Sequence, residues 1–157
     1  MTWRGSATVS DRIFASLPYL LPLVDGVIFG RYLFSQFPAL SVVFVPLIPL
    51  VQLNNTPFVS LIIFFALFLL VIRNENISHF IRFNAMQAIL LDIVIFLVSL
   101  LLRILSPVPG IDFAIETLTN TLFLGIVAAF VYSVAQSLLG RYAEIPAISD
   151  AVRMQVP

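Results

Sequence analysis

Cysteine and lysine are both absent from the sequence, and charged residues of any kind are rare. The chain has 157 residues, of which 10% are charged and none is cysteine. Without cysteine there can be no disulfide bond and no thiolate metal site. All eight basic residues are arginine and they balance eight acidic residues, with no basic run of the kind that binds nucleic acid. We therefore expect no nucleic-acid partner.

Signatures of catalysis and cofactor binding are missing as well. The sequence has no nucleophile elbow, no HExxH motif and no glycine-rich phosphate loop. The only histidine, His79, has no cluster of carboxylates or cysteines around it that could complete a metal site. The expectation is a protein that is not an enzyme, with no catalytic, metal or cofactor-binding residue.

What the sequence has in excess is apolar side chains. Hydrophobic residues make up 61% of the chain, against roughly 45–50% in soluble domains. A core of this size leaves about a third of the unfolded surface exposed, so the excess must face something other than water. Long apolar runs then predict a protein embedded in a lipid bilayer.

Four apolar blocks separated by short joints predict an all-α, polytopic membrane protein in a single domain, residues 1–157. Its predicted architecture is a four-helix transmembrane bundle with an additional short re-entrant or interfacial helix. Prolines inside the first block predict a kink there, and the stretch after Pro38 is too short to cross alone; the reverse assignment within 13–52 stays open. The predicted parts are an N-terminal tail (1–11), span 1 (12–34), the short element (39–52), span 2 (57–73), span 3 (81–105), span 4 (113–140) and a C-terminal tail (141–157).

The arginines predict the orientation. With four crossings, both tails and the joint between spans 2 and 3 share one side, and this side carries six of the eight arginines. Arginine accumulates on the cytosolic side of membranes. Both tails are therefore expected in the cytosol, or in the stroma of a plastid.

Polar residues inside the spans are candidates for a polar path or for contacts between helices. On a helix through 82–103, Asp92, Ser99 and Arg103 fall on one face, with Asn84 and Gln87 on its flank. A charge near the bilayer centre costs at least about 2.5–3.5 kcal/mol, so Asp92 should face protein or water. Whether the stripe lines a path or joins helices stays open at this point. The candidate residues are Asn84, Gln87, Asp92, Ser99, Asp25 and Arg31.

Small residues recur every four positions in the first and last spans. Gly26 and Gly30 form one such ridge, and Gly125, Ala129 and Ser133 form another. Ridges of this kind allow close packing of helices in membranes. We expect both to be packing surfaces.

Three stretches together resemble a known family: "SLPYLLPLVDGVIFGRYLF", "VIRNENISHFIRFNAMQAILLDI" and "IPAISDAVRMQV". They are similar to the Tic twenty-kilodalton family, a membrane subunit of the chloroplast inner-envelope protein translocon, and to its cyanobacterial homologues. The likeness runs from about Asp11 to Val156. It implies four membrane helices with both tails in the stroma or cytosol, and a location in the plastid inner envelope or a cyanobacterial plasma or thylakoid membrane. Because the first residues do not read as a transit peptide, we expect a cyanobacterial or plastid-encoded member.

The resemblance implies a subunit of a protein-translocation complex, similar to the preprotein-import channel component. Its expected partners are other membrane subunits, in a homo- or hetero-oligomer, together with preprotein substrates and the lipid bilayer. One alternative is a non-transporting assembly factor or a small accessory subunit of a larger photosynthetic membrane complex. A further alternative is an ion- or proton-coupled carrier that uses Asp92.

Overall fold

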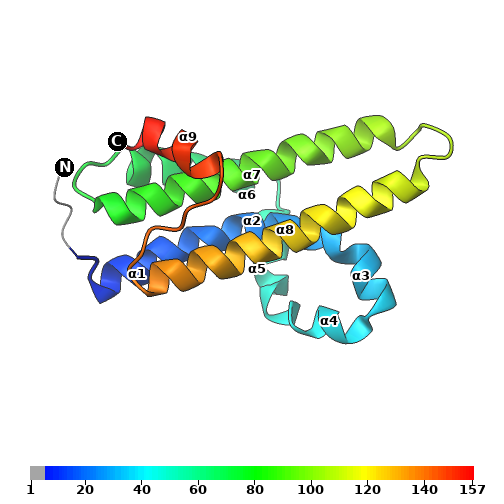
Figure 1. Ribbon diagram of the computed structural model, residues 1–157, viewed down its shortest axis with the longest axis horizontal. Helices are drawn as coiled ribbons and strands as arrows, with labels where there is room; N and C mark the ends of the chain where they lie inside the picture. The colour runs from blue at the N-terminus through cyan, green and yellow to red at the C-terminus, as the bar shows by residue number, and fades with distance from the viewer. Residues whose placement is uncertain (1–5) are drawn as a thin grey trace.

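Helices make up nearly all of the structure, a computed structural model that describes residues 6–157 (Figure 1). The predicted all-α class is confirmed, because no strand occurs among these residues. Three helical segments are long and apolar enough to cross a bilayer, so this is a multi-pass membrane protein. In chain order the α-helices are α1 (Val9–Ser16), α2 (Leu20–Gly26), α3 (Arg31–Gln36), α4 (Pro38–Val42), α5 (Ile48–Asn54), α6 (Val59–Ala66), α7 (His79–Leu105), α8 (Asp112–Leu138) and α9 (Ile148–Gln155).

The first span is a single broken helix of 28 residues, Val9–Gln36. It joins α1, α2 and α3 through two 3-10 turns, η1 (Leu17–Tyr19) and η2 (Val27–Gly30). Pro18 and Pro22 have no N–H group to donate, and each therefore interrupts the helical hydrogen bonding that surrounds it.

The first span also begins earlier than the sequence predicts. Thr8 caps the helix, because its Oγ1 accepts a hydrogen bond from the Asp11 N–H at 3.1 Å and the Asp11 carboxylate accepts one from the Thr8 N–H at 3.1 Å. Helix α1 thus starts at Val9, inside the stretch 1–11 that we expect to be a tail. Residues 1–5 of that stretch lie outside the described residues.

Between the first span and α7 the chain bends sharply. The segment Val45–Asn54, which contains α5, meets the segment Val59–Ile72 at 92°. The latter consists of α6 and a π-helical turn, η4 (Leu67–Ile72). Its 14 residues reach about 21 Å at 1.5 Å per residue, less than the roughly 30 Å of a hydrocarbon core. The structure therefore has three long spans, and a fourth only if the bent pair crosses as one unit.

Helices α7 and α8 are each 27 residues long and form an antiparallel pair (Figure 1). Helix α8 ends at Leu138, and two residues later Gly140 has a φ of 74°, which is easily adopted only without a side chain. There the Arg141 N–H donates to the Gln136 carbonyl at 2.8 Å, which closes the helix C-terminus. We call the end of the bundle that carries α1 and α9 the tail end, and the end with the α7–α8 connection (106–111) the loop end.

The C-terminal stretch 141–157, expected as a tail, folds back on the bundle. Helix α9 packs across the tail end of α7, and its Val152, together with Val156 just after the helix, joins Phe83 and Ile89 in a buried apolar cluster. The His79 ring lies between two partners, with its Nε2 3.0 Å from the Val156 carbonyl oxygen and its Nδ1 2.9 Å from the Tyr142 hydroxyl. The tail end is therefore a closed, well-packed cap.

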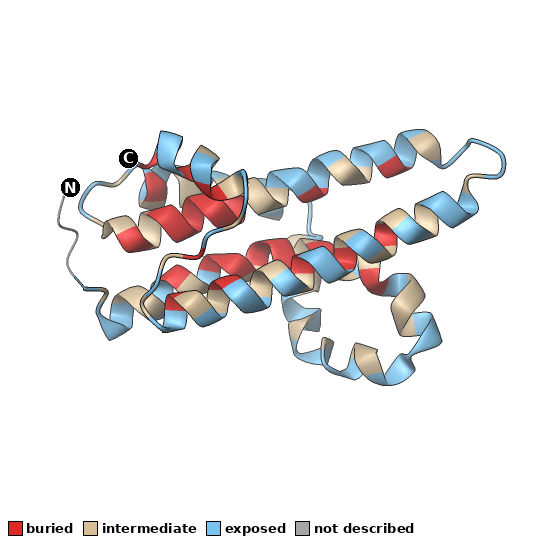
Figure 2. Ribbon diagram, viewed as in Figure 1, coloured by how far each residue is buried: buried red, intermediate tan, exposed pale blue. Residues whose placement is uncertain are grey.

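Burial is uneven along the bundle. Buried residues are concentrated in the tail half, whereas the loop halves of α7 and α8 are mostly exposed within this chain (Figure 2). The exposed side chains include large apolar ones, such as Phe96, Ile104 and Phe113. Their surroundings must be apolar, either lipid or other membrane subunits.

Candidate functional site

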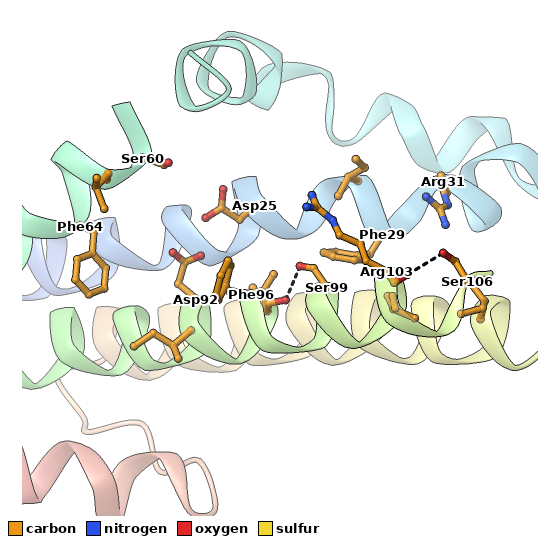
Figure 3. A pocket seen from close by; sticks show the side chains of 16 residues that line it. Asp25, Phe29, Arg31, Ser60, Phe64, Asp92, Phe96, Ser99, Arg103 and Ser106 are labelled. Carbon is orange, nitrogen blue, oxygen red and sulfur yellow. Dashed lines mark hydrogen bonds between the residues drawn. The ribbon is translucent and has the colours of Figure 1, made fainter. Parts of the chain in front are cut away.

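A cavity of about 810 Å³ lies between the first span, α6 and α7 (Figure 3). Most of its wall is apolar, but seven polar side chains also line it. They are Asp25, Arg31, Ser60, Asp92, Ser99, Arg103 and Ser106. A mostly apolar hollow with a few convergent polar groups has the usual character of a binding site.

Asp92 is the central residue of α7 and lies 13 positions from either end. At 1.5 Å per residue this places it about 20 Å from both ends of the helix. Its Oδ1 atom is buried and has no hydrogen-bond partner among the described residues. Figure 3 shows the Asp92 carboxyl group pointing into the cavity, towards Asp25 of α2. The acid at mid-depth therefore faces a cavity within the protein.

Asp25 is held by a residue that the sequence analysis missed. The Asn54 side-chain N–H of α5 donates a hydrogen bond to Asp25 Oδ1. Asn54 Oδ1 is buried and, like Asp92 Oδ1, has no partner in the described part of the chain. The bend between α5 and α6 brings Asn54 back over α2, so nothing in the local sequence pattern around it indicated this contact.

Towards the loop end the lining of the cavity becomes basic. Arg103 extends from α7 towards the first span, and Arg31 lies on the first span nearer the loop end than Asp25 (Figure 3). Ser99, between Asp92 and Arg103, donates its hydroxyl to the Ile95 carbonyl at 2.9 Å. The cavity thus has carboxylates at mid-depth and guanidinium groups near its outer end.

Asn84 and Gln87 do not reach this cavity. At about 100° per residue they lie about 80° and about 140° around α7 from Asp92, so they point to other neighbours. Both are fully buried at the tail end. The Tyr19 hydroxyl donates to Asn84 Oδ1 at 2.6 Å, and Gln87 Nε2 donates to the Tyr19 oxygen at 3.0 Å.

The same network ties the C-terminal segment to the bundle. The Ser149 hydroxyl of α9 donates to Gln87 Oε1 at 2.7 Å, and Gln87 Nε2 also donates to the Ala143 carbonyl at 3.2 Å. From α8, the Ser137 hydroxyl donates to Asn84 Oδ1 at 3.2 Å. Asn84 and Gln87 therefore join helices, and only the Asp92 side of the predicted stripe lines a cavity.

A family comparison gives the wider context of this architecture. The model of a family described as the chloroplast import apparatus, Tic20-like, matches residues 9–152. The chain belongs to the Tic20 family. The matched region includes every residue of the cavity and of α7, and the resemblance seen in the sequence is confirmed.

Members of the Tic20 family from cyanobacteria and from plastids align with this chain over nearly its whole length. A Tic20 family protein of Synechocystis is 49% identical over 158 residues, which cover 99% of both chains. Protein TIC 20-II, chloroplastic, of Arabidopsis thaliana is 37% identical, with 99% of this chain and 78% of the plant protein covered. The Tic20 family protein Ycf60 of Gracilaria tenuistipitata is 38% identical, with 95% and 76% covered.

In this Tic20-family chain the ridge of Gly26 and Gly30 packs closely against α8, whereas the ridge of Gly125, Ala129 and Ser133 is buried only at Ser133. A Cβ atom on Gly26 or Gly30 would lie within 3 Å of Ile126 or Phe123 of α8, respectively, so both glycines allow close approach. Around Gly125, by contrast, no such contact occurs within 4 Å. Gly125 and Ala129 instead line a shallow apolar hollow of about 340 Å³ between α7 and α8, and Ser133 is buried.

The side chains that line the cavity are suited to binding a guest molecule. Among residues 6–157 no group of three or more histidines, cysteines or carboxylates is arranged to hold a metal ion. The polar groups that line the cavity, two carboxylates, two guanidiniums and three hydroxyls, can exchange hydrogen bonds with a polar or charged guest.

Proposed function

We propose that this Tic20-family chain is a membrane subunit of a protein-translocating complex, and that its cavity contacts the passing polypeptide. The observation that carries the proposal is the cavity with Asp92 at mid-depth. A polypeptide that crosses a bilayer needs partners for its backbone N–H and C=O groups, which hydrocarbon cannot supply. The carboxylates and hydroxyls that line the cavity can supply them. The family description, chloroplast import apparatus, supports the same function.

The cavity lies at the side of the bundle, between the first span, α6 and α7. A narrow bundle has no room for a polypeptide along its axis, so one wall of the path has to come from another protein. We therefore propose that a second copy or another membrane subunit completes it. The membrane is the plastid inner envelope or a cyanobacterial plasma or thylakoid membrane, with both tails in the stroma or cytosol.

Site-directed crosslinking tests the contact with polypeptide. Because the chain has no cysteine, single cysteines at Ser60 and Ser99 carry a photoreactive probe into the cavity. Leu97 is the matched control, since it lies at almost the depth of Ser99, is 57% exposed and does not line the cavity. With a labelled precursor arrested during transport, Ser60→Cys and Ser99→Cys form precursor adducts and Leu97→Cys does not. Equal yields at all three positions would contradict the proposal.

The same experiment distinguishes a path for polypeptide from the alternative function, that of a non-transporting assembly factor or accessory subunit. In that case all three positions form adducts only with resident membrane proteins. The precursor then remains free, whatever the position of the probe. Such an outcome would exclude the proposed polypeptide path and favour a structural role in a larger complex.

Replacement of Asp92 by leucine tests whether the acid serves function or folding. Its buried Oδ1 lacks a protein partner, and a buried polar atom of this kind costs free energy. Asp92→Leu is therefore expected to leave the thermal unfolding midpoint unchanged or raised, and to lower the yield of precursor adducts from Ser99→Cys. A lowered midpoint would instead identify the carboxyl group as a structural contact. If Asp92→Leu preserves both the adduct yield and the assembly of the complex, Asp92 is not a residue of the polypeptide path.

A further inference from the structure

The loop end of the cavity carries two positive charges without an acidic partner. Arg31 and Arg103 both line the cavity, and among the described residues no carboxylate forms an ion pair with either guanidinium. Along their helices the two acids of the cavity are distant: Asp25 lies about 10 Å from Arg31 and Asp92 about 16 Å from Arg103. Two guanidinium groups in a mostly apolar hollow favour an anion between them.

The position of these arginines corresponds to the surface of a bilayer. Arg103 lies two residues before the C-terminal end of α7, and Arg31 begins α3, the last part of the first span. Asp92 marks mid-depth, so Arg103 lies about 16 Å towards one surface. Half of a hydrocarbon core is about 15 Å thick. The Arg103 guanidinium is thus at the level of lipid headgroups on the side of the loop end, and Arg31, about 10 Å along the first span from Asp25, lies a few ångströms deeper with a side chain long enough to reach that level.

Two hydroxyl groups lie close to these arginines. The Arg31 guanidinium lies 4.9 Å from the centre of the Tyr32 ring, and its Nη2 donates to the Tyr32 hydroxyl at 3.3 Å. This contact holds the Arg31 side chain beside the cavity, which Tyr32 itself does not line. Ser106 also lines the cavity, and its hydroxyl donates to the Arg103 carbonyl at 3.0 Å. Between these arginines and the two carboxylates at mid-depth the wall is mainly apolar, with Phe29, Phe96 and Leu102 beside Ser99, and this stretch suits an acyl chain.

We infer that the loop end of the cavity binds a membrane lipid with a net negative headgroup. Arg31 and Arg103 hold the headgroup oxygens by charge-assisted hydrogen bonds, and one acyl chain lies along the apolar wall towards Phe96. Guanidinium groups bind the oxygens of phosphate headgroups through paired, charge-assisted hydrogen bonds. A lipid fits better than a free anion because the basic groups adjoin a long apolar wall that a free anion would leave empty. This inference is independent of any contact with polypeptide.

Lipid binding by the purified full-length chain tests the inference. In neutral detergent, phosphatidylglycerol, phosphatidylcholine and inorganic phosphate are titrated separately, with native mass spectrometry and the unfolding midpoint as readouts. Phosphatidylglycerol is expected to bind and to raise the midpoint, and phosphatidylcholine, without net charge, to bind more weakly. Inorganic phosphate alone should have no effect. If phosphate alone binds as well as phosphatidylglycerol, the site takes a free anion and the lipid assignment is overturned.

Arginine variants locate the site. A hydrogen bond to a charged group contributes about 1.5–3 kcal/mol, so Arg31→Gln and Arg103→Gln should each weaken phosphatidylglycerol binding at least about tenfold. Arg103→Lys keeps the charge without the paired donors and should weaken binding less.

Arg141→Gln is the control, because Arg141 is an exposed arginine at the tail end. Both mutated arginines are exposed, so folding is retained. Equal affinities for Arg31→Gln, Arg103→Gln and Arg141→Gln would overturn the inference.

Discussion

Two polar residues of α7, Asn84 and Asp92, are eight positions apart and have opposite surroundings. Asn84 is fully buried, and both of its side-chain atoms have partners: its Nδ2 donates to the Phe80 carbonyl at 2.8 Å and its Oδ1 accepts from Tyr19 and Ser137. Asp92 has an oxygen without a partner in a cavity. A satisfied polar network stabilises a fold, whereas an unsatisfied buried group marks a place where binding can supply the missing bond.

The Asn84 network makes a prediction about stability. Asn84→Ala leaves the buried Tyr19 and Ser137 hydroxyls without their acceptor, and should lower the free energy of unfolding by about 1–3 kcal/mol. Reversible unfolding of the purified protein in mixed micelles measures this change. Asn120→Ala is the control, because Asn120 is only partly buried and its Oδ1 has no partner to lose. A loss of equal size in both variants would show that the effect comes from helix packing and not from the network.

At the scale of elements, hydropathy predicts the long helices well and the short ones poorly. The helices α7 and α8 are close to the ranges 81–105 and 113–140 expected from apolar runs, because a bilayer requires about 20 apolar residues in succession. Helix α9 was expected as a tail, since eight residues with charges at Asp150 and Arg153 give no such signal. The position of α9 depends on tertiary contacts. Ser149 donates a hydrogen bond to Gln87, and Val152 packs in the buried apolar cluster at the tail end.

The same distinction applies to the candidate site. The α7 side of the cavity, Asp92 to Arg103, follows from helical periodicity. The opposite wall depends on how the chain bends after α5, and a contact between Asn54 and Asp25, 29 positions apart, has no periodic signal. A sequence pattern fixes which residues share a face, but not which face of another helix they meet.

The hydrogen bond from Asn54 to Asp25 is a polar contact that holds α5 against the first span. Asn54→Leu removes this bond to a carboxylate, worth about 1.5–3 kcal/mol, and should increase the local opening of α5 about ten- to a hundredfold. Hydrogen–deuterium exchange of the peptide amides in 48–54 measures the opening. Gln52→Leu is the control on the same helix, because Gln52 is exposed and its side chain has no hydrogen bond among the described residues. Unchanged exchange in Asn54→Leu would show that apolar packing alone holds α5.

At the scale of the whole molecule, the direction of the helices determines how many times the chain crosses the membrane. Helices α1 and α7 both begin at the tail end, and α8 returns there before α9 (Figure 1). The chain between Gln36 and His79 must therefore travel back from the loop side, although α6 and η4 cover only about 21 Å. From this arrangement we infer an even number of crossings, in which the bent pair of segments forms the fourth span. It agrees with the arginines, because Arg12, Arg82 and Arg141 all lie near the tail end.

This topology makes a prediction that can be tested in membrane vesicles. Single cysteines are introduced at Ser6 and Met154, on the tail side, and at Val108, in the loop-end connection; all three positions are exposed. A membrane-impermeant maleimide should label Ser6→Cys and Met154→Cys from the cytosolic or stromal face only, because arginine accumulates there. Val108→Cys should be labelled only from the opposite face. If Ser6→Cys and Met154→Cys are labelled from opposite faces, the number of crossings is odd, and the bent segment then enters and leaves the membrane on one side.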